Sequence, residues 1–168
     1  NQLEAQADSL LRAQQWAKAE RTLRKLVKKR PQDSTVLARL STTQQRLGQL
    51  TKAVDTLKKA NHLSPDDPAL LMQLAELYYD SGRLNESLAH ANRSIALSPT
   101  DGQLRRKRAT LLMRTGDPHA ACVDLQAAHD AAPDDLYALS ALVDGIIAGA
   151  NVPMDTESAS LLLKRQPF

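Results

Sequence analysis

The sequence predicts an all-α protein in which a short helical unit repeats along the chain. Prolines recur every 34 residues, at Pro31, Pro65, Pro99 and Pro133. Between them, apolar residues recur at the three- and four-residue spacing of amphipathic helices. Aromatic residues make up only 3% of the chain, whereas sheet proteins draw heavily on aromatic and β-branched residues. Together these observations favour an array of helices over a sandwich or a barrel.

The joint between successive units is a proline followed two residues later by an aspartate. The stretches RPQD, SPDD, SPTD and APDD place Asp33, Asp67, Asp101 and Asp135 in the same register. Proline cannot continue a helix, and an aspartate side chain can cap the first turn of the next one. Each joint is therefore expected to end one helix and to start another.

A glycine divides each unit into two helices. Gly48, Gly82 and Gly116 keep the 34-residue step, and glycine suits the turn that follows a helix. The first unit departs from this pattern because Gln14 stands where the turn glycine is expected. The fourth unit departs from it through Pro118, which comes just after the turn.

Apolar and small residues predict which faces of these helices are buried. Small residues are expected where the two helices of a unit cross, Ala75 against Ser87 and Ala109 against Ala121, because they let the backbones approach closely. The expected buried faces are Leu37, Leu40, Gln44 and Leu47 before one glycine, Leu70, Leu71, Leu74, Leu77 and Tyr78 before the next, and Ala53, Val54, Leu57, Leu88, Ala91 and Ile95 in second helices.

Helix hairpins with this period resemble the tetratricopeptide repeat (TPR), whose unit is 34 residues. The best-matching stretch is 68–101, in which Leu74, Ala75, Tyr78 and Gly82 occupy the family's leucine, small-residue, tyrosine and turn positions. The resemblance covers residues 1 to about 149 and implies a right-handed α-solenoid of stacked antiparallel helix hairpins. It divides one TPR domain into repeats at 1–33, 34–67, 68–101 and 102–135, with a partial fifth repeat and a C-terminal helix over 136–168.

The last segment predicts two more helices. The stretch DLYALSALVDGIIAGA is apolar at helical spacing, and MDTESASLLLKR indicates a final helix that begins at Asp155 or Thr156. Terminal repeats need a polar outer face to stay soluble, which the three consecutive leucines at 161–163 do not supply. We therefore expect a fragment of a larger protein, truncated within the array or continuing into another domain.

Residues with catalytic or metal-binding chemistry are sparse. His62, His90, His119 and His129 do not form pairs at metal-ligand spacing. Cys122 is the single cysteine and lies on the apolar side of a predicted helix, so we expect a buried, inert thiol. The sequence contains no glycine-rich phosphate loop and no nucleophile elbow. We expect no enzyme activity, no cofactor and no metal.

The net charge of +3 is too small to indicate a nucleic-acid partner. By segment the charge is +4 for 1–33, +2 for 34–67, −2 for 68–101, 0 for 102–135 and −1 for 136–168. The basic stretch KLVKKRPQD is best explained by cations facing the negative end of a helix dipole. No apolar run approaches the roughly 20 residues needed to span a bilayer.

The resemblance also implies a binding surface, because the first helices of TPR arrays line a concave groove that holds a peptide. Flexible methionines and amphipathic tyrosines would form an adaptable apolar floor, and arginines would select carboxylates on the partner. We thus expect a protein partner with acidic and apolar residues. The predicted partner-binding residues are Arg39, Thr42, Arg46, Met72, Gln73, Glu76, Tyr79, Arg106, Lys107, Thr110, Met113, Arg114 and Tyr137.

The run Arg105 to Arg108 leaves three interpretations open: solvated charge, peptide contact or nucleic-acid binding. Nucleic acid is the least favoured, because no aromatic stacking residues interleave with the cations. Arg105 and Arg108 stand at apolar places of the repeat, where their charged heads need partners. Candidate partners are Glu76, Asp80 and Asp124.

A chaperone-binding role is disfavoured. The TPR subset that grips the C-terminal carboxylate of heat-shock chaperones resembles a clamp of lysine, asparagine and arginine side chains. The corresponding positions hold Glu4, Asp8, Arg39, Ala69 and Gln73 counted from the first repeat, or Ala38, Thr42, Gln73, Gln103 and Lys107 counted from the second. Neither set supplies the clamp.

The preferred hypothesis is a non-catalytic TPR scaffold that holds a peptide segment or a neighbouring domain. The Ala-, Gln- and Arg-rich repeats look bacterial, and by analogy alone they suggest an envelope assembly such as polysaccharide export, a pilus or secretion. The compartment is not fixed, and this analogy favours the periplasm slightly over the cytoplasm. The alternative is a targeting or regulatory arm of an enzyme whose catalytic domain lies outside this chain. A weaker third possibility is binding of an anionic polymer by the basic N-terminal half.

Overall fold

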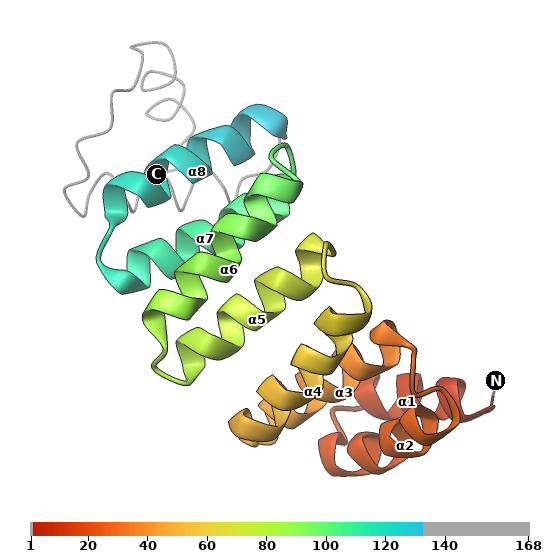
Figure 1. Cartoon of the computed structure of the whole chain (residues 1–168). Helices are drawn as coiled ribbons and strands as arrows, with labels where there is room; N and C mark the ends of the chain where they lie inside the picture. The colour runs from red at the N-terminus through yellow and green to blue at the C-terminus, as the bar shows by residue number, and fades with distance from the viewer. Residues whose placement is uncertain (1, 133–168) are drawn as a thin grey trace, which may run out of the picture. The chain divides into compact units, whose positions relative to one another are not determined.

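A computed structural model describes residues 2–132 of the 168-residue chain. In this range the elements are helices, with no strand among them. The helices are α1 (Gln2–Arg12), α2 (Trp16–Lys29), α3 (Ser34–Arg46), α4 (Leu50–Leu63), α5 (Pro68–Asp80), α6 (Leu84–Leu97), α7 (Gly102–Thr115) and α8 (Pro118–Ala131) (Figure 1). The prediction of an all-α array of helix hairpins is confirmed over these residues. The helices expected in 136–168 lie outside them, as do Asp135 and Tyr137.

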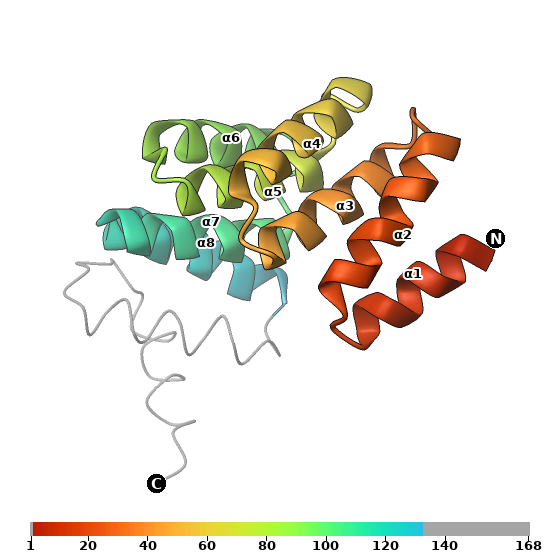
Figure 2. The same ribbon diagram turned by 90° about the horizontal axis from the view of Figure 1, so that it is seen from below.

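The chain divides into two compact units, Asn1–Leu97 and Ser98–Phe168. In the first, which we call the N-terminal unit, the consecutive pairs α1 and α2, α3 and α4, and α5 and α6 pack together as hairpins (Figures 1 and 2). In addition, α2 packs on α3 and α4 packs on α5, so neighbouring hairpins stack on each other. The described part of the C-terminal unit is the hairpin of α7 and α8.

The proline–aspartate joints start helices as the sequence predicts. Asp33 Oδ1 accepts hydrogen bonds from the backbone N–H groups of Thr35 and Val36, both at 3.1 Å. Asp67 and Asp101 cap α5 and α7 in the same way, with distances between 2.8 and 3.2 Å. Each such cap is worth about 1 kcal/mol, because it satisfies N–H groups that the helix itself leaves unbonded.

The turn between the two helices of a hairpin has one backbone geometry in all four hairpins. Gly48, Gly82 and Gly116 have φ angles of 72°, 74° and 88°, in the left-handed region that glycine adopts without steric strain. The N–H that follows each turn residue donates to the carbonyl five residues earlier, at 2.8 or 2.9 Å. Gln14 takes the same place in the first hairpin, with φ of 53°. A side chain is therefore held in the strained conformation where the other repeats use glycine.

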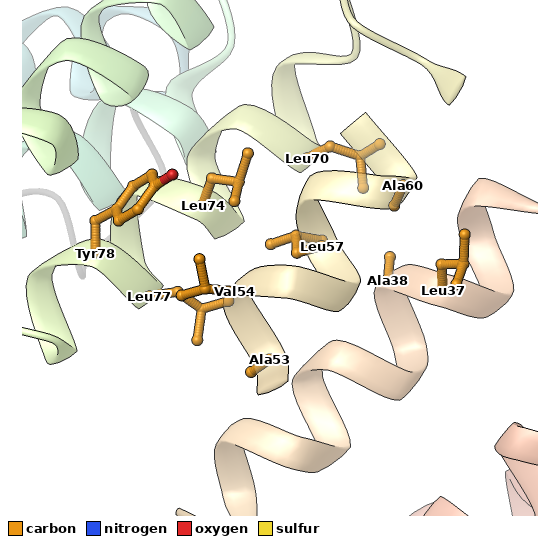
Figure 3. Packing of buried hydrophobic residues seen from close by; sticks show 10 residues of the cluster. All are labelled: Leu37, Ala38, Ala53, Val54, Leu57, Ala60, Leu70, Leu74, Leu77 and Tyr78. Carbon is orange, nitrogen blue, oxygen red and sulfur yellow. The ribbon is translucent and has the colours of Figure 1, made fainter. Parts of the chain in front are cut away.

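Apolar packing around α4 stabilises the N-terminal unit. The buried cluster there consists of Leu37 and Ala38 from α3, Ala53, Val54, Leu57 and Ala60 from α4, and Leu70, Leu74, Leu77 and Tyr78 from α5 (Figure 3). Burying one such leucine stabilises the fold by about 1.5–3 kcal/mol. Because the cluster draws on three helices of two hairpins, it joins the hairpins as well as closing them. Most of the predicted apolar positions are thus confirmed as core.

Small residues and buried hydroxyl groups tighten the hairpins further. Ala75, Ser87, Ala109 and Ala121 are at most 1% exposed, as expected of residues at close helix crossings. Ser41 donates from its buried hydroxyl to the carbonyl of Ala53 at 2.7 Å, which links α3 directly to α4.

Candidate partner-binding surfaces

The first helices of the N-terminal unit present a row of polar side chains, which we call the first-helix face: Asp8 of α1, Arg39, Thr42, Gln45 and Arg46 of α3, and Gln73, Glu76, Tyr79 and Asp80 of α5. Side chains of neighbouring repeats meet on it. The Arg39 guanidinium pairs with the carboxylate of Asp8, and Gln45 donates from Nε2 to Asp80 Oδ2 at 2.7 Å. These contacts run between helices of successive hairpins. The face is therefore continuous across three repeats.

Several predicted site residues of this face are accessible to a partner. Thr42 and Arg46 are exposed, while Gln73, Glu76 and Tyr79 are half-buried. The buried Oε1 of Gln73 has no hydrogen-bond donor among the described residues. An unsatisfied buried acceptor of this kind costs stability.

The prediction for Met72 is wrong. Its side chain is completely buried, so it does not form the floor of an accessible surface. Helix α5 packs against both α4 and α6. Seven of the thirteen residues of this helix are buried, which is more than one apolar stripe can hold. The face opposite the leucines is consequently narrower than the sequence pattern suggests.

The C-terminal unit contributes predicted residues from α7. Lys107, Thr110 and Arg114 are exposed, whereas Arg106 and Met113 are half-buried. The Thr110 hydroxyl donates to the carbonyl of Arg106 at 3.0 Å. We call these five residues the α7 face.

The other two arginines of the basic run, Arg105 and Arg108, share one buried carboxylate. Asp124 of α8 is completely buried. Its Oδ1 accepts from Arg105 Nη1 at 3.0 Å and from Arg108 Nη2 at 2.5 Å, and its Oδ2 accepts from Arg108 Nε at 2.5 Å. Arg105 also donates from Nε to the carbonyl of Pro99 at 2.7 Å. Of the three partners considered from the sequence, Asp124 is the one that these contacts identify.

This triad replaces apolar packing that the preceding repeats use at the same positions. One repeat earlier, Arg105 and Arg108 correspond to Leu71 and Leu74, both at most 1% exposed. Both guanidinium groups thus depend on the carboxylate of Asp124. A buried pair of this kind holds its geometry well, although it adds little stability over leucines. We assign Arg105 and Arg108 to the fold of the hairpin and not to a partner-binding surface.

One cation of the KLVKKRPQD stretch also has a structural partner. Arg30 Nη1 lies 2.5 Å from Glu4 Oε1 and thereby ties α1 to the end of α2. Its hydrogen bond is the main reason that the pKa of the Glu4 carboxyl lies below its ordinary value. Lys28 and Lys29 are exposed in the last turn of α2, where the helix dipole favours cations.

Cys122 is completely buried, as expected, and burial raises the pKa of its thiol. A thiol with a raised pKa forms little thiolate and reacts slowly. Within residues 2–132 no group of three or more His, Cys, Asp and Glu side chains is placed to hold a metal ion. No helix in the same range has the length and apolar character required to cross a membrane.

Comparisons with known proteins agree with this architecture. Two family models, each described as a tetratricopeptide repeat, match residues 4–68 and 44–111. No curated protein matches the chain. Among solved structures, the thermophilic TPR protein TTC0263 of Thermus thermophilus is 22% identical, with a TM-score of 0.75 over 84% of this chain and 78% of that one.

Two further similar structures are peptide-binding TPR proteins by their descriptions. The first TPR of Spaghetti (RPAP3), bound to the HSP90 peptide SRMEEVD, is 19% identical, with a TM-score of 0.63 over 70% of this chain and 93% of that one. YrrB, a TPR protein with an unusual peptide-binding site, is 16% identical, with a TM-score of 0.67 over 96% and 83%. At these identities the likeness establishes the fold alone.

Proposed function

Because the chain belongs to the tetratricopeptide repeat family, we propose that it is a non-catalytic scaffold that holds a peptide segment or a neighbouring domain on its first helices. The observation that supports this most is the continuous, accessible first-helix face, on which Arg39 meets Asp8 and Gln45 meets Asp80 across successive hairpins. TPR domains are generally protein-interaction modules without catalytic activity of their own. Two solved proteins of similar fold are described as peptide-binding.

The side chains on these surfaces indicate the chemistry of the partner. Arg46 of the first-helix face and Lys107 and Arg114 of the α7 face are exposed cations, which attract carboxylates. Tyr79 and Met113 are half-buried and offer adaptable apolar contact beside them. Each of the two surfaces, taken by itself, therefore fits a segment that combines acidic and apolar residues.

The heat-shock chaperone C-terminus fits it poorly. The positions that would form its clamp hold acidic or small residues in one register, Glu4, Asp8 and Ala69 among them. Asp8 is moreover paired with Arg39. The lysine and asparagine side chains that would bind the chaperone's carboxylate are therefore missing from this register.

We place the scaffold in a bacterial envelope assembly, such as polysaccharide export, a pilus or a secretion system. This finer statement depends on the Ala-, Gln- and Arg-rich composition of the repeats and on analogy with arrays of this kind. The partner would then be an envelope protein or an adjoining domain of the same polypeptide. The partner's identity in a capture experiment tests it directly.

The binding proposal is tested by charge reversal on α7. The bait is the purified chain, and the partner is captured from the native organism and then purified. Exchanging Arg106 and Lys107 together for glutamate is expected to weaken binding of the partner about tenfold, as for the loss of one to two charged contacts, in a variant whose helicity shows that it is folded. In the matched control, Lys28 and Lys29 on α2 are exchanged for glutamate, and binding of the partner should stay intact. Undiminished binding by the folded α7 variant would remove these residues from the site.

A further inference from the structure

The N-terminal unit contains a hollow on the side of its second helices. It lies between α2 and α4, over α3, and has a volume of about 590 Å³. Its floor is apolar and consists of Val27, Leu37, Leu40 and Leu63. We call it the α2–α4 pocket. Leu37 and Leu40 are at most 5% exposed, so the floor is the outer edge of the core and not a loose surface loop.

The rim of the α2–α4 pocket is basic. Lys59 and His62 of α4 line it and are exposed. Lys58 lines it too, although its ammonium lies 5.9 Å from the ring centre of Tyr78. No acidic residue belongs to the lining. The two repeats that build the pocket, 1–33 and 34–67, carry charges of +4 and +2, so the surrounding field has the same sign as the rim.

The helix dipole explains only part of this arrangement. It favours a basic residue such as His62 in the last turn of α4. It does not require an open apolar hollow beneath that residue. Exposed apolar surface is unfavourable in water, and a hollow of about 590 Å³ is within the range of about 300–1,000 Å³ that ligand pockets occupy. The combination of apolar floor and basic rim is the one that an acidic segment with large apolar side chains complements.

We propose that the α2–α4 pocket is a second docking site, which takes a short acidic peptide segment through two adjacent large apolar side chains. The apolar pair lies on Val27, Leu40 and Leu63, and carboxylates on either side lie against Lys59 and His62. No residue of the first-helix face belongs to the lining of the pocket, so the two surfaces are separate. The scaffold can then hold one partner segment on its first helices and another on α2 and α4.

The probes that test this site are three capped six-residue peptides: DELFDE, DESSDE, which lacks the apolar pair, and KRLFKR, which reverses the charge. Amide shifts of the ¹⁵N-labelled chain are followed as each peptide is added to millimolar concentration. The expected result is that DELFDE moves the amides of the end of α2, the α2–α3 joint and the end of α4, and that the other two peptides bind much more weakly. Equal binding of DESSDE, or of KRLFKR, would overturn the proposal, as would shifts confined to α1, α3 and α5.

Two variants assign the binding to the pocket. Thr56→Trp fills the hollow from its half-buried wall and is expected to abolish the DELFDE shifts. Exchanging both Lys59 and His62 for glutamate leaves the hollow open and is expected to weaken the binding of DELFDE about tenfold. Lys52→Glu is the matched control: this lysine is exposed on the same helix and lies outside the lining, so DELFDE should bind the variant almost as well. Unchanged binding by the double reversal would contradict the assignment even if the tryptophan variant failed to fold.

This test is independent of the proposed function. None of the changed residues belongs to the first-helix face or to the α7 face. A scaffold that bound its partner on α7 and ignored DELFDE would retain the proposed function and lose the second site.

Discussion

Removing the carboxylate of Asp124 tests the structure of the fourth hairpin most severely. The change Asp124→Ala leaves the guanidinium groups of Arg105 and Arg108 in place, each with its side chain only 20% exposed. Three hydrogen bonds to the carboxylate disappear at once. Breaking a buried ion pair from one side destabilises a protein by about 3–5 kcal/mol, because the remaining charge is left uncompensated. We expect a loss near the upper end, since two cations lose the same partner.

A second variant distinguishes the cost of leaving Arg105 and Arg108 without the Asp124 carboxylate from the cost of lost packing. The triple variant exchanges Arg105, Arg108 and Asp124 for leucine, leucine and threonine. These are the residues that the second repeat has at the corresponding positions, Leu37, Leu40 and Thr56. Replacing a whole buried ion cluster by apolar residues is often neutral or stabilising by about 1–4 kcal/mol. The triple variant should therefore be at least as stable as the natural chain, although it carries three changes and Asp124→Ala carries one.

The assay is native-state hydrogen exchange of the amides of α7 and α8 in the full chain. Exchange resolves the hairpin separately, which matters because repeat arrays need not unfold in one step. A loss of less than about 1 kcal/mol in the Asp124→Ala variant would mean that the carboxylate is solvated, since exposed pairs have that magnitude. A triple variant less stable than Asp124→Ala would also refute the reasoning.

Three further results are expected. Gln14→Gly should stabilise the chain by up to about 1 kcal/mol in urea unfolding, because φ of 53° is strained for a side chain, whereas Gly82→Ala should destabilise it by a similar amount; no gain from the glycine would contradict the strain. The Cys122 thiol should react with a thiol-specific reagent many times more slowly in the folded chain than in urea, and equal rates would show that it is not buried. The hydrogen bond from Arg83 lowers the pKa of Glu86, so the stabilisation from this pair is present above the ordinary pKa of 4.5 and is lost as the pH falls through the lowered pKa. In the Arg83→Gln variant, titration of the carboxyl carbon followed by NMR should give a higher pKa for Glu86.

The sequence predicts the helical hairpins well because their boundaries depend on local chemistry. Proline and aspartate at a joint act within one turn of the helix that they end or start, and Asp33, Asp67 and Asp101 all cap as expected. The turn geometry is equally local. Even the departure at Gln14 is visible in the sequence, because the period marks the place where glycine is missing.

Surface assignment is less successful, because it depends on how many neighbours each helix has. Helical periodicity shows one apolar stripe, yet α5 packs against both α4 and α6 and buries Met72. Periodicity alone does not distinguish a flexible methionine of an accessible floor from one enclosed by a second neighbour. The alternation of leucine, methionine and alanine around most of α5 was the signal for a helix buried on several sides.

Long-range polar pairing is also beyond sequence analysis alone. The apolar register of Arg105 and Arg108 shows that their heads need partners, but three carboxylates met that description. Selecting Asp124 requires the packing of α8 on α7. The α2–α4 pocket is a similar case, since Val27, Leu40 and Leu63 lie on three different helices and only folding brings them together.

Site-specific photocrosslinking tests the central claim, that recognition takes place on the first helices, most directly. A photoreactive residue is placed in turn at Thr42 of α3, Thr110 of α7, Lys52 of α4 and Val123 of α8, all of which are exposed. The captured partner is then added and irradiated. We predict that one partner crosslinks strongly at Thr42 and Thr110 and weakly at Lys52 and Val123. Strong crosslinks at the two second-helix positions, with none at the first-helix positions, would contradict the account.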